Sequence, residues 1–189
     1  MTNLQLVFPE IFLSLSIMFL LMLGVFKKNS SKIIQNLSLV VLLVTAIITF
    51  NETIGIKEVK LFNNSIIIDY LSSLMKIVTL LATFLVLIIS SNYLRTFKIF
   101  KIEYPILILS SVLGMMIMIS SNDLIVFYMG LELQSLALYV LATFNRDQIK
   151  SSEAGLKYFV LSALSSGLLL YGCSPVSYTH LRAHETTYD

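Results

Sequence analysis

The chain has 189 residues, of which 57% are hydrophobic and only 13% are charged, with a mean hydropathy of +0.86. Soluble domains carry roughly 25% charged residues, so this composition excludes a water-soluble globule and favours a protein that spans a lipid bilayer. The net charge of +2, without a basic patch interleaved with aromatic residues, excludes nucleic acid as a partner.

Cysteine and glycine usage limits the chemistry that the chain can carry. Cys173 is the single cysteine of the sequence, which excludes an internal disulfide and a thiolate-held iron–sulfur cluster. The sequence also has no glycine-rich motif of the kind whose backbone N–H groups cradle a nucleotide phosphate. We therefore expect the chain to bind no cofactor and no metal of its own.

Six apolar stretches are each long enough to cross a hydrocarbon core, which takes about 20 residues. They lack the alternating pattern of membrane strands, and a helix satisfies its own backbone hydrogen bonds in lipid. The sequence thus predicts an all-α, polytopic transmembrane helix bundle within residues 1–174. The predicted helices cover residues 4–26, 33–50, 67–94, 104–120, 124–144 and 152–172.

Lysine and arginine are concentrated in every second loop between these helices. Short basic loops stay on the cytoplasmic side of a membrane. The pattern predicts an N-terminus on the outer side of a bacterial inner membrane, or of a mitochondrial one if the chain is organellar. The three basic loops contain Lys27, Lys28, Lys32, Arg95, Lys98, Lys101, Arg146 and Lys150, whereas the intervening loops hold only Lys57 and Lys60.

The third predicted helix contains a lysine, Lys76, seven residues after Asp69. This spacing places the two side chains on one helical face, about two turns apart. We interpret Lys76 as a shallow lysine whose side chain reaches outward past a boundary aspartate.

A carboxylate, Glu132, lies near the middle of the fifth predicted helix. It is the ninth residue after a start at Leu124, about 12 Å into the membrane at ~1.5 Å per residue. An ionisable group at this depth costs about 2.5 kcal/mol or more, so it marks a functional site by default. We favour a proton-relay carboxylate over a structural polar contact between helices. Its neighbours at helical spacing form a polar stripe of Tyr128, Ser135, Tyr139 and Thr143.

Lys157, in the first turns of the sixth predicted helix, is the candidate cation for Glu132. A desolvated lysine suits a proton relay because burial favours its neutral form. However, Glu153 precedes it by four residues, the spacing of an ion pair on a helix surface. Spacing alone leaves the relay and the surface pair equally open.

The composition changes abruptly after Cys173. Residues 176–186 read VSYTHLRAHET and resemble a translated sequencing adapter, so we predict that residues 175–189 are a non-native, unstructured tail. His180 and His184 have the spacing of two metal ligands on one helical face. We nevertheless favour an appendage without selected function, in which case the natural protein continues beyond this point.

A specific family resemblance is carried by residues 130–172, which read GLELQSLALYVLATFNRDQIKSSEAGLKYFVLSALSSGLLLYG. This string closely resembles subunit N of bacterial NADH-quinone oxidoreductase, called subunit 2 in mitochondria. The resemblance extends more loosely through SSNDLIVFYMGLE and over the first four helices. It implies the opening part of an antiporter-like fold of about fourteen helices with inverted repeats.

The resemblance also implies roles for two residues. The family's fifth-helix glutamate falls on Glu132 and its sixth-helix lysine on Lys157, where Glu132 would tune nearby lysines and Lys157 would hold or pass a proton. NADH, FMN, iron–sulfur clusters and quinone would bind in other subunits, and the partners would be other membrane-arm subunits and lipid. The family's further lysines have no counterpart in this chain, so we expect the chain alone to be inactive.

Two other functions stay open at this point. A subunit of a multi-subunit sodium/proton antiporter or membrane-bound hydrogenase would share the pattern of buried carboxylate and lysine. A passive membrane scaffold would instead use Glu132 and Lys157 only to hold helices together. The identity of the partner subunits distinguishes an antiporter or hydrogenase subunit from a subunit of the oxidoreductase. A charge-conserving substitution such as Glu132→Asp distinguishes a scaffold, which should tolerate the change without a loss of transport.

Overall fold

The computed structural model describes residues 6–26, 31–53, 59–62, 64–96, 101–145 and 148–185, with only the backbone described for residues 174–185. These residues form six α-helices and one β-hairpin. The helices are α1 (Phe8–Phe26), α2 (Ser31–Thr53), α3 (Tyr70–Thr96), α4 (Glu103–Ser120), α5 (Leu124–Ala142) and α6 (Ile149–Glu185), and the strands are β1 (Val59–Leu61) and β2 (Ile66–Ile68).

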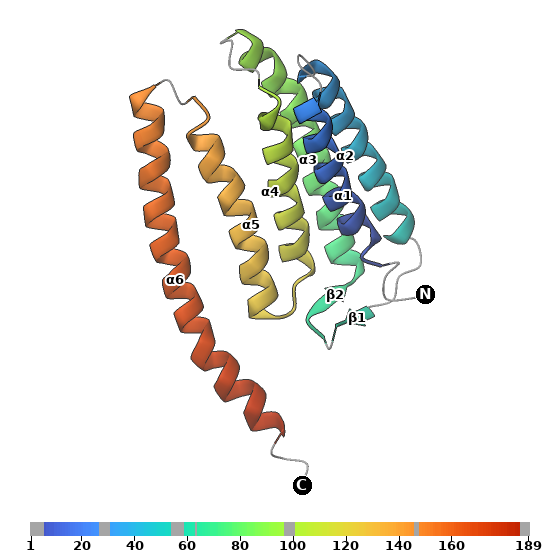
Figure 1. Cartoon of the computed structure of the whole chain (residues 1–189). Coiled ribbons are helices and arrows are strands. Elements are labelled where there is room, and N and C mark those ends of the chain that lie inside the picture. Colours follow the sequence, from blue (N-terminus) through green and yellow to red (C-terminus); the bar gives the residue numbers. More distant parts are fainter. Residues whose placement is uncertain are drawn as a thin grey trace.

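Successive helices run in opposite directions (Figure 1). Helices α1 to α4 pack into one bundle, α5 lies along α4, and α6 packs against α5 at the edge of the molecule. All six helices are long and apolar enough to cross a membrane. The predicted all-α, polytopic helix bundle is therefore confirmed.

The core of the bundle lies between α1, α2, α3 and α4. Apolar side chains fill it, and hydroxyl groups within it donate hydrogen bonds to carbonyl oxygens one turn back in their own helix, as Thr45 does to Val41 and Thr83 to Thr79. These bonds satisfy polar groups that would otherwise be costly away from water. The fully buried core side chains include Leu13, Leu20, Ile34, Leu42, Leu80, Leu87, Leu109, Val112 and Met116.

A β-hairpin covers one end of the bundle, where the sequence predicts only a polar loop. Strands β1 and β2 pair antiparallel, with Val59 opposite Ile68 and Leu61 opposite Ile66. Leu61 and Ile68 are buried against Leu6, which explains why these residues pair as strands. As a result α3 begins at residue 70, three residues later than the predicted start at residue 67.

Helix α6 is longer than predicted. Its backbone continues through Glu185, whereas the part suited to spanning a membrane ends at Cys173. The helical backbone differs from the unstructured tail predicted after residue 174, because extending a formed helix is easier than starting one. The side chains of His180 and His184, and residues 186–189, lie outside the described part, and the non-native origin of the tail stays a prediction.

Candidate functional site

Glu132 lies at the middle of α5, as predicted, and its side chain is half-buried. The Oε1 atom is fully buried and has no hydrogen-bond partner among the described residues. A buried acceptor without a partner costs about 1–3 kcal/mol, and more when it is charged. The packing around α5 thus leaves one acceptor oxygen of this carboxyl group without a donor among the described residues.

The start of α5 is set by its capping residue. Asp123 accepts a hydrogen bond from the backbone N–H of Ile125 at 3.2 Å, which satisfies one of the free donors at a helix N-terminus. Because this cap fixes the first residue of α5, it also fixes the depth of Glu132 along the helix.

Two glycines bring α5 close to α4. A Cβ atom added at Gly114 would lie 2.7 Å from the carbonyl oxygen of Gly130 and 2.7 Å from the backbone nitrogen of Gln134. This contact between helix backbones leaves no room for a side chain. It places the turn containing Glu132 directly beside α4.

The polar stripe of α5 faces α6 over its last two turns. Tyr139 is buried, donates a hydrogen bond to Ser162, and packs edge-on against the rings of Tyr158 and Phe159. Near the helix end, Thr143 contacts α6 so closely that a Cβ at Gly155 would lie 1.9 Å from its methyl carbon. Tyr139 and Thr143 of the polar stripe therefore face α6.

Lys157 lies on α6, on a face that is exposed in this structure. Its Nζ forms an ion pair with Glu153 at 2.6 Å, and the two side chains are 67% and 57% exposed. This is the surface pair that the spacing left open, and the structure does not bring Lys157 to Glu132 within the described residues. Its role in a proton relay stays a prediction.

The structure contradicts the interpretation of Lys76 as a shallow lysine. It is only 3% exposed, and its Nζ forms an ion pair of 2.5 Å with Oε1 of Glu10 on α1. The partner lies 66 residues away in sequence, so the pair depends on how α1 and α3 pack. The Lys76 side chain therefore does not reach outward past Asp69, as the sequence had suggested.

Asp69 instead caps α3 outside the spanning segment. Its Oδ1 accepts a hydrogen bond from the backbone N–H of Ser72 at 2.7 Å, and the Ser72 hydroxyl accepts one from the backbone N–H of Asp69 at 2.9 Å. The hydrogen bond from the Ser72 N–H, supported by the Ser72 side chain, lowers the pKa of Asp69 below its usual value. Asp69 thus belongs to the helix end.

Glu10 is the ionisable residue that the sequence analysis missed. It is 8% exposed, and its Oε2 atom is buried with no hydrogen-bond partner among the described residues. In sequence it resembles an ordinary acidic residue in the first turn of a helix. The helical spacing of Glu10 could have indicated its burial. Glu10 lies three residues before Leu13 and seven before Ile17, so all three side chains share the buried face of α1.

Comparisons with known proteins show which family the chain resembles. The family model described as "NADH:quinone oxidoreductase/Mrp antiporter, TM" matches residues 121–182, which include Glu132 and Lys157. NADH-quinone oxidoreductase subunit N of Pelagibacter ubique is 68% identical over 93% of this chain and 37% of the relative. The same subunit of Maricaulis maris is 49% identical over 92% of this chain and 36% of the relative. The chain thus spans little more than a third of these relatives.

Two solved structures share the fold. A chain of respiratory complex I from Thermus thermophilus, determined with bound aureothin, has a TM-score of 0.73 at 24% identity, over 89% of this chain and 36% of that one. A chain of the membrane-bound sulfane sulfur reductase, an archaeal respiratory membrane complex, has a TM-score of 0.72 at 20% identity, over 90% and 36%. The resemblance drawn from residues 130–172 is confirmed by the relatives, and the fold by these structures.

Proposed function

We propose that this chain, which belongs to the NADH-quinone oxidoreductase subunit N family, is part of a proton-translocating membrane subunit of that enzyme complex. Electrons would pass from NADH to quinone in other subunits, which would hold the redox cofactors. The role is that of the whole subunit, since this chain spans 37% of its Pelagibacter relative. Other subunits of the membrane arm, together with lipid, would be its partners.

The observation that supports this function best is the state of Glu132. A carboxyl group with a buried oxygen that has no partner among the described residues lies halfway along an apolar helix, inside the segment that the family model matches. Packing alone does not require a carboxyl group at this place, because an uncharged side chain would avoid the cost. A group that gains and loses a proton as neighbouring charges change accounts for it.

In this scheme Glu132 responds to the charge of nearby lysines, and Lys157 holds or passes a proton. Lys157 would leave the Glu153 carboxylate when it takes part, because its exposed ion pair contributes little stability. The surface location of this pair also weakens the scaffold alternative, in which Lys157 would be bonded to Glu132. The subunit N relatives favour this function over an antiporter or hydrogenase subunit.

The basic residues at the helix ends support a location in a bacterial inner membrane with the N-terminus outside. Lys32, Arg95, Lys101 and Lys150 belong to the ends of α2, α3, α4 and α6 that lie together at one end of the bundle (Figure 1). The hairpin lies at the opposite end. Basic residues near the ends of spanning helices mark the cytoplasmic side.

The proposed function is tested by replacing Glu132 in the intact complex reconstituted in lipid vesicles. We expect Glu132→Gln to reduce proton-coupled quinone reduction by about a hundredfold, the lower end of the range for general acid–base groups, and Glu132→Asp to retain much of it. Glu103→Gln, which removes an exposed carboxylate from the end of α4, is the control. Unchanged turnover and unchanged protons per electron in Glu132→Gln would rule out the proposed role.

A further inference from the structure

Three ionisable side chains from three helices meet near the hairpin end of the bundle. Glu10 on α1 and Lys76 on α3 form the buried ion pair, at 8% and 3% exposure. Glu52, half-buried in the last turn of α2, interacts electrostatically with both. We call Glu10, Glu52 and Lys76 the outer cluster.

The charges of the outer cluster do not balance. Two carboxylates interact with one ammonium group, and the second carboxylate, on the half-buried Glu52, adds a negative charge beside a pair that is almost fully buried, which is costly. The Oε2 atom of Glu10 is buried and unpartnered within the described residues, so it is a free acceptor. One added proton would neutralise the cluster and give this oxygen a bound hydrogen.

Within the part of the chain that the structure describes, Lys76 is the cation that interacts with Glu10 and Glu52, and Lys57 lies outside that part. Asp69, between β2 and α3, also interacts with Lys76, but it is negative and already bonded to Ser72. Lys60 on β1 has an exposed side chain with an interaction of its own. The side of α4 that faces Glu10 presents Leu113, Ile117 and Ser120, none of which is charged.

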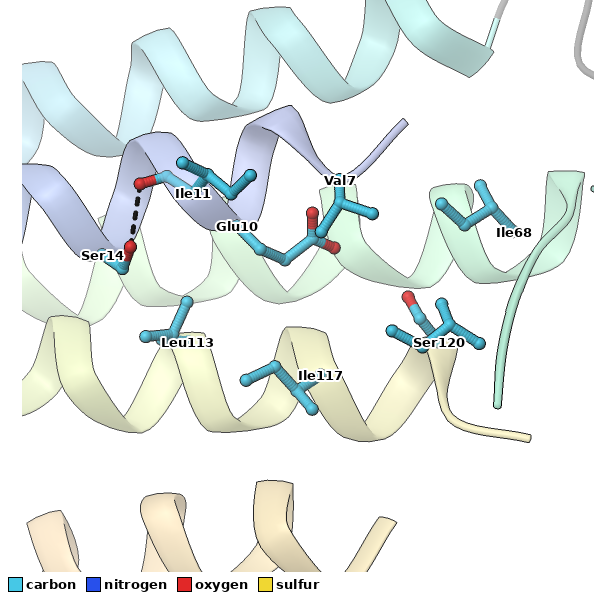
Figure 2. A pocket seen from close by; sticks show the side chains of 9 residues that line it. Val7, Glu10, Ile11, Ser14, Ile68, Leu113, Ile117 and Ser120 are labelled. Carbon is cyan, nitrogen blue, oxygen red and sulfur yellow. Dashed lines mark hydrogen bonds between the residues drawn. The ribbon is translucent and has the colours of Figure 1, made fainter. Parts of the chain in front are cut away.

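A cavity lies beside Glu10. It has a volume of about 320 Å³ and lies between α1, α4 and β2. Figure 2 shows the Glu10 side chain extending from α1 toward the part of this cavity where Ile68 and Ser120 lie. Its walls are almost entirely apolar, because the hydroxyl groups of Ser14 and Ser120 donate hydrogen bonds to carbonyl oxygens of their own helices. The volume nevertheless exceeds the roughly 30 Å³ that one water molecule occupies.

We propose that the outer cluster is a proton-binding site, which holds one exchangeable proton shared between the carboxyl groups of Glu10 and Glu52. The proton exchanges with the hairpin side of the membrane through the cavity beside Glu10. This inference goes beyond the proposed function, because it involves neither Glu132 nor Lys157 and holds even for a chain that moves no protons.

Infrared spectroscopy of the full chain in lipid tests the site. A protonated carboxyl group has a C=O absorption that differs from that of a carboxylate and shifts in D₂O. The measurement uses Glu132→Gln as the background, so that a failure of the proposed function and a failure of this site are distinguished. At about pH 6, well above the usual glutamate pKa of ~4.3, we expect the absorption of one protonated carboxyl group.

The variants give opposite results. Glu10→Gln or Glu52→Gln leaves one carboxylate for one ammonium group, so the absorption of the protonated carboxyl group should disappear. Lys76→Met leaves two carboxyl groups without a cation, so this absorption should increase. Glu103→Gln should change nothing. Glu52 is half-buried, so its variant tests the site even if a change at Glu10 prevents folding. No absorption at this pH, or an absorption that persists in Glu52→Gln, would overturn the proposal.

Discussion

Charge is held inside the bundle in two different ways. Lys76 and Glu10 neutralise each other across two helices, whereas Glu132 has a buried oxygen without a partner among the described residues. The depth of Glu132 could be predicted, because it depends only on position within one helix. The burial of Lys76 could not be predicted, because its partner lies on another helix.

Lys76 and Glu10 give a prediction about stability. Removing one partner breaks a buried, hydrogen-bonded ion pair, so Lys76→Met should destabilise the bundle by about 3–5 kcal/mol. The double change Glu10→Gln with Lys76→Met should recover a large part of this loss. Thermal unfolding of the chain in detergent, followed by circular dichroism, measures both. Equal destabilisation by the single and double changes would mean that the pair does not couple α1 to α3.

Helix ends were easier to predict than the elements that join them. Asp123 caps α5 as its residue type suggests, since capping is a local effect of one side chain on the following N–H groups. The hairpin was missed because its strands are only three residues long and are stabilised by burial against Leu6. It is tied to the link between α4 and α5, where Asn122 donates hydrogen bonds to Ser65 and Asn64.

The contact of α4 with α5 gives a prediction at this scale. Gly114→Ala places a methyl group 2.7 Å from backbone atoms that cannot rotate away, so the helices must separate. We expect a loss of about 1–3 kcal/mol, typical of overpacking, in thermal unfolding. Gly167→Ala on α6 is the matched control, because a Cβ there meets nothing within 4 Å. Similar losses in both variants would contradict a specific close contact.

The overall arrangement follows from six apolar segments joined by short connections. Antiparallel neighbours were predictable for α4 and α5, since the link between them is only three residues long. The packing of α1 to α4 around one core was not predictable, because the apolar faces do not identify their partners. The outer face of α6 carries exposed apolar side chains such as Leu161, Leu164 and Leu168, as expected for a surface facing lipid or protein.

Membrane orientation is the prediction for the whole molecule. Lys32→Cys and Lys60→Cys, each made in a Cys173→Ser background, place single thiols at opposite ends of the bundle. An impermeant reagent applied to intact cells should label position 60 and not position 32, because the basic end stays inside. Labelling of position 32 alone would reverse the proposed orientation.

Glu132 is proposed to exchange a proton inside the membrane. The decisive measurement is a structure of the intact complex at a resolution that shows bound water. We predict a water molecule, or an ionisable side chain such as Lys157, within about 3.2 Å of the Glu132 carboxyl group. A carboxyl group surrounded only by apolar side chains, or open to bulk water, would contradict the account.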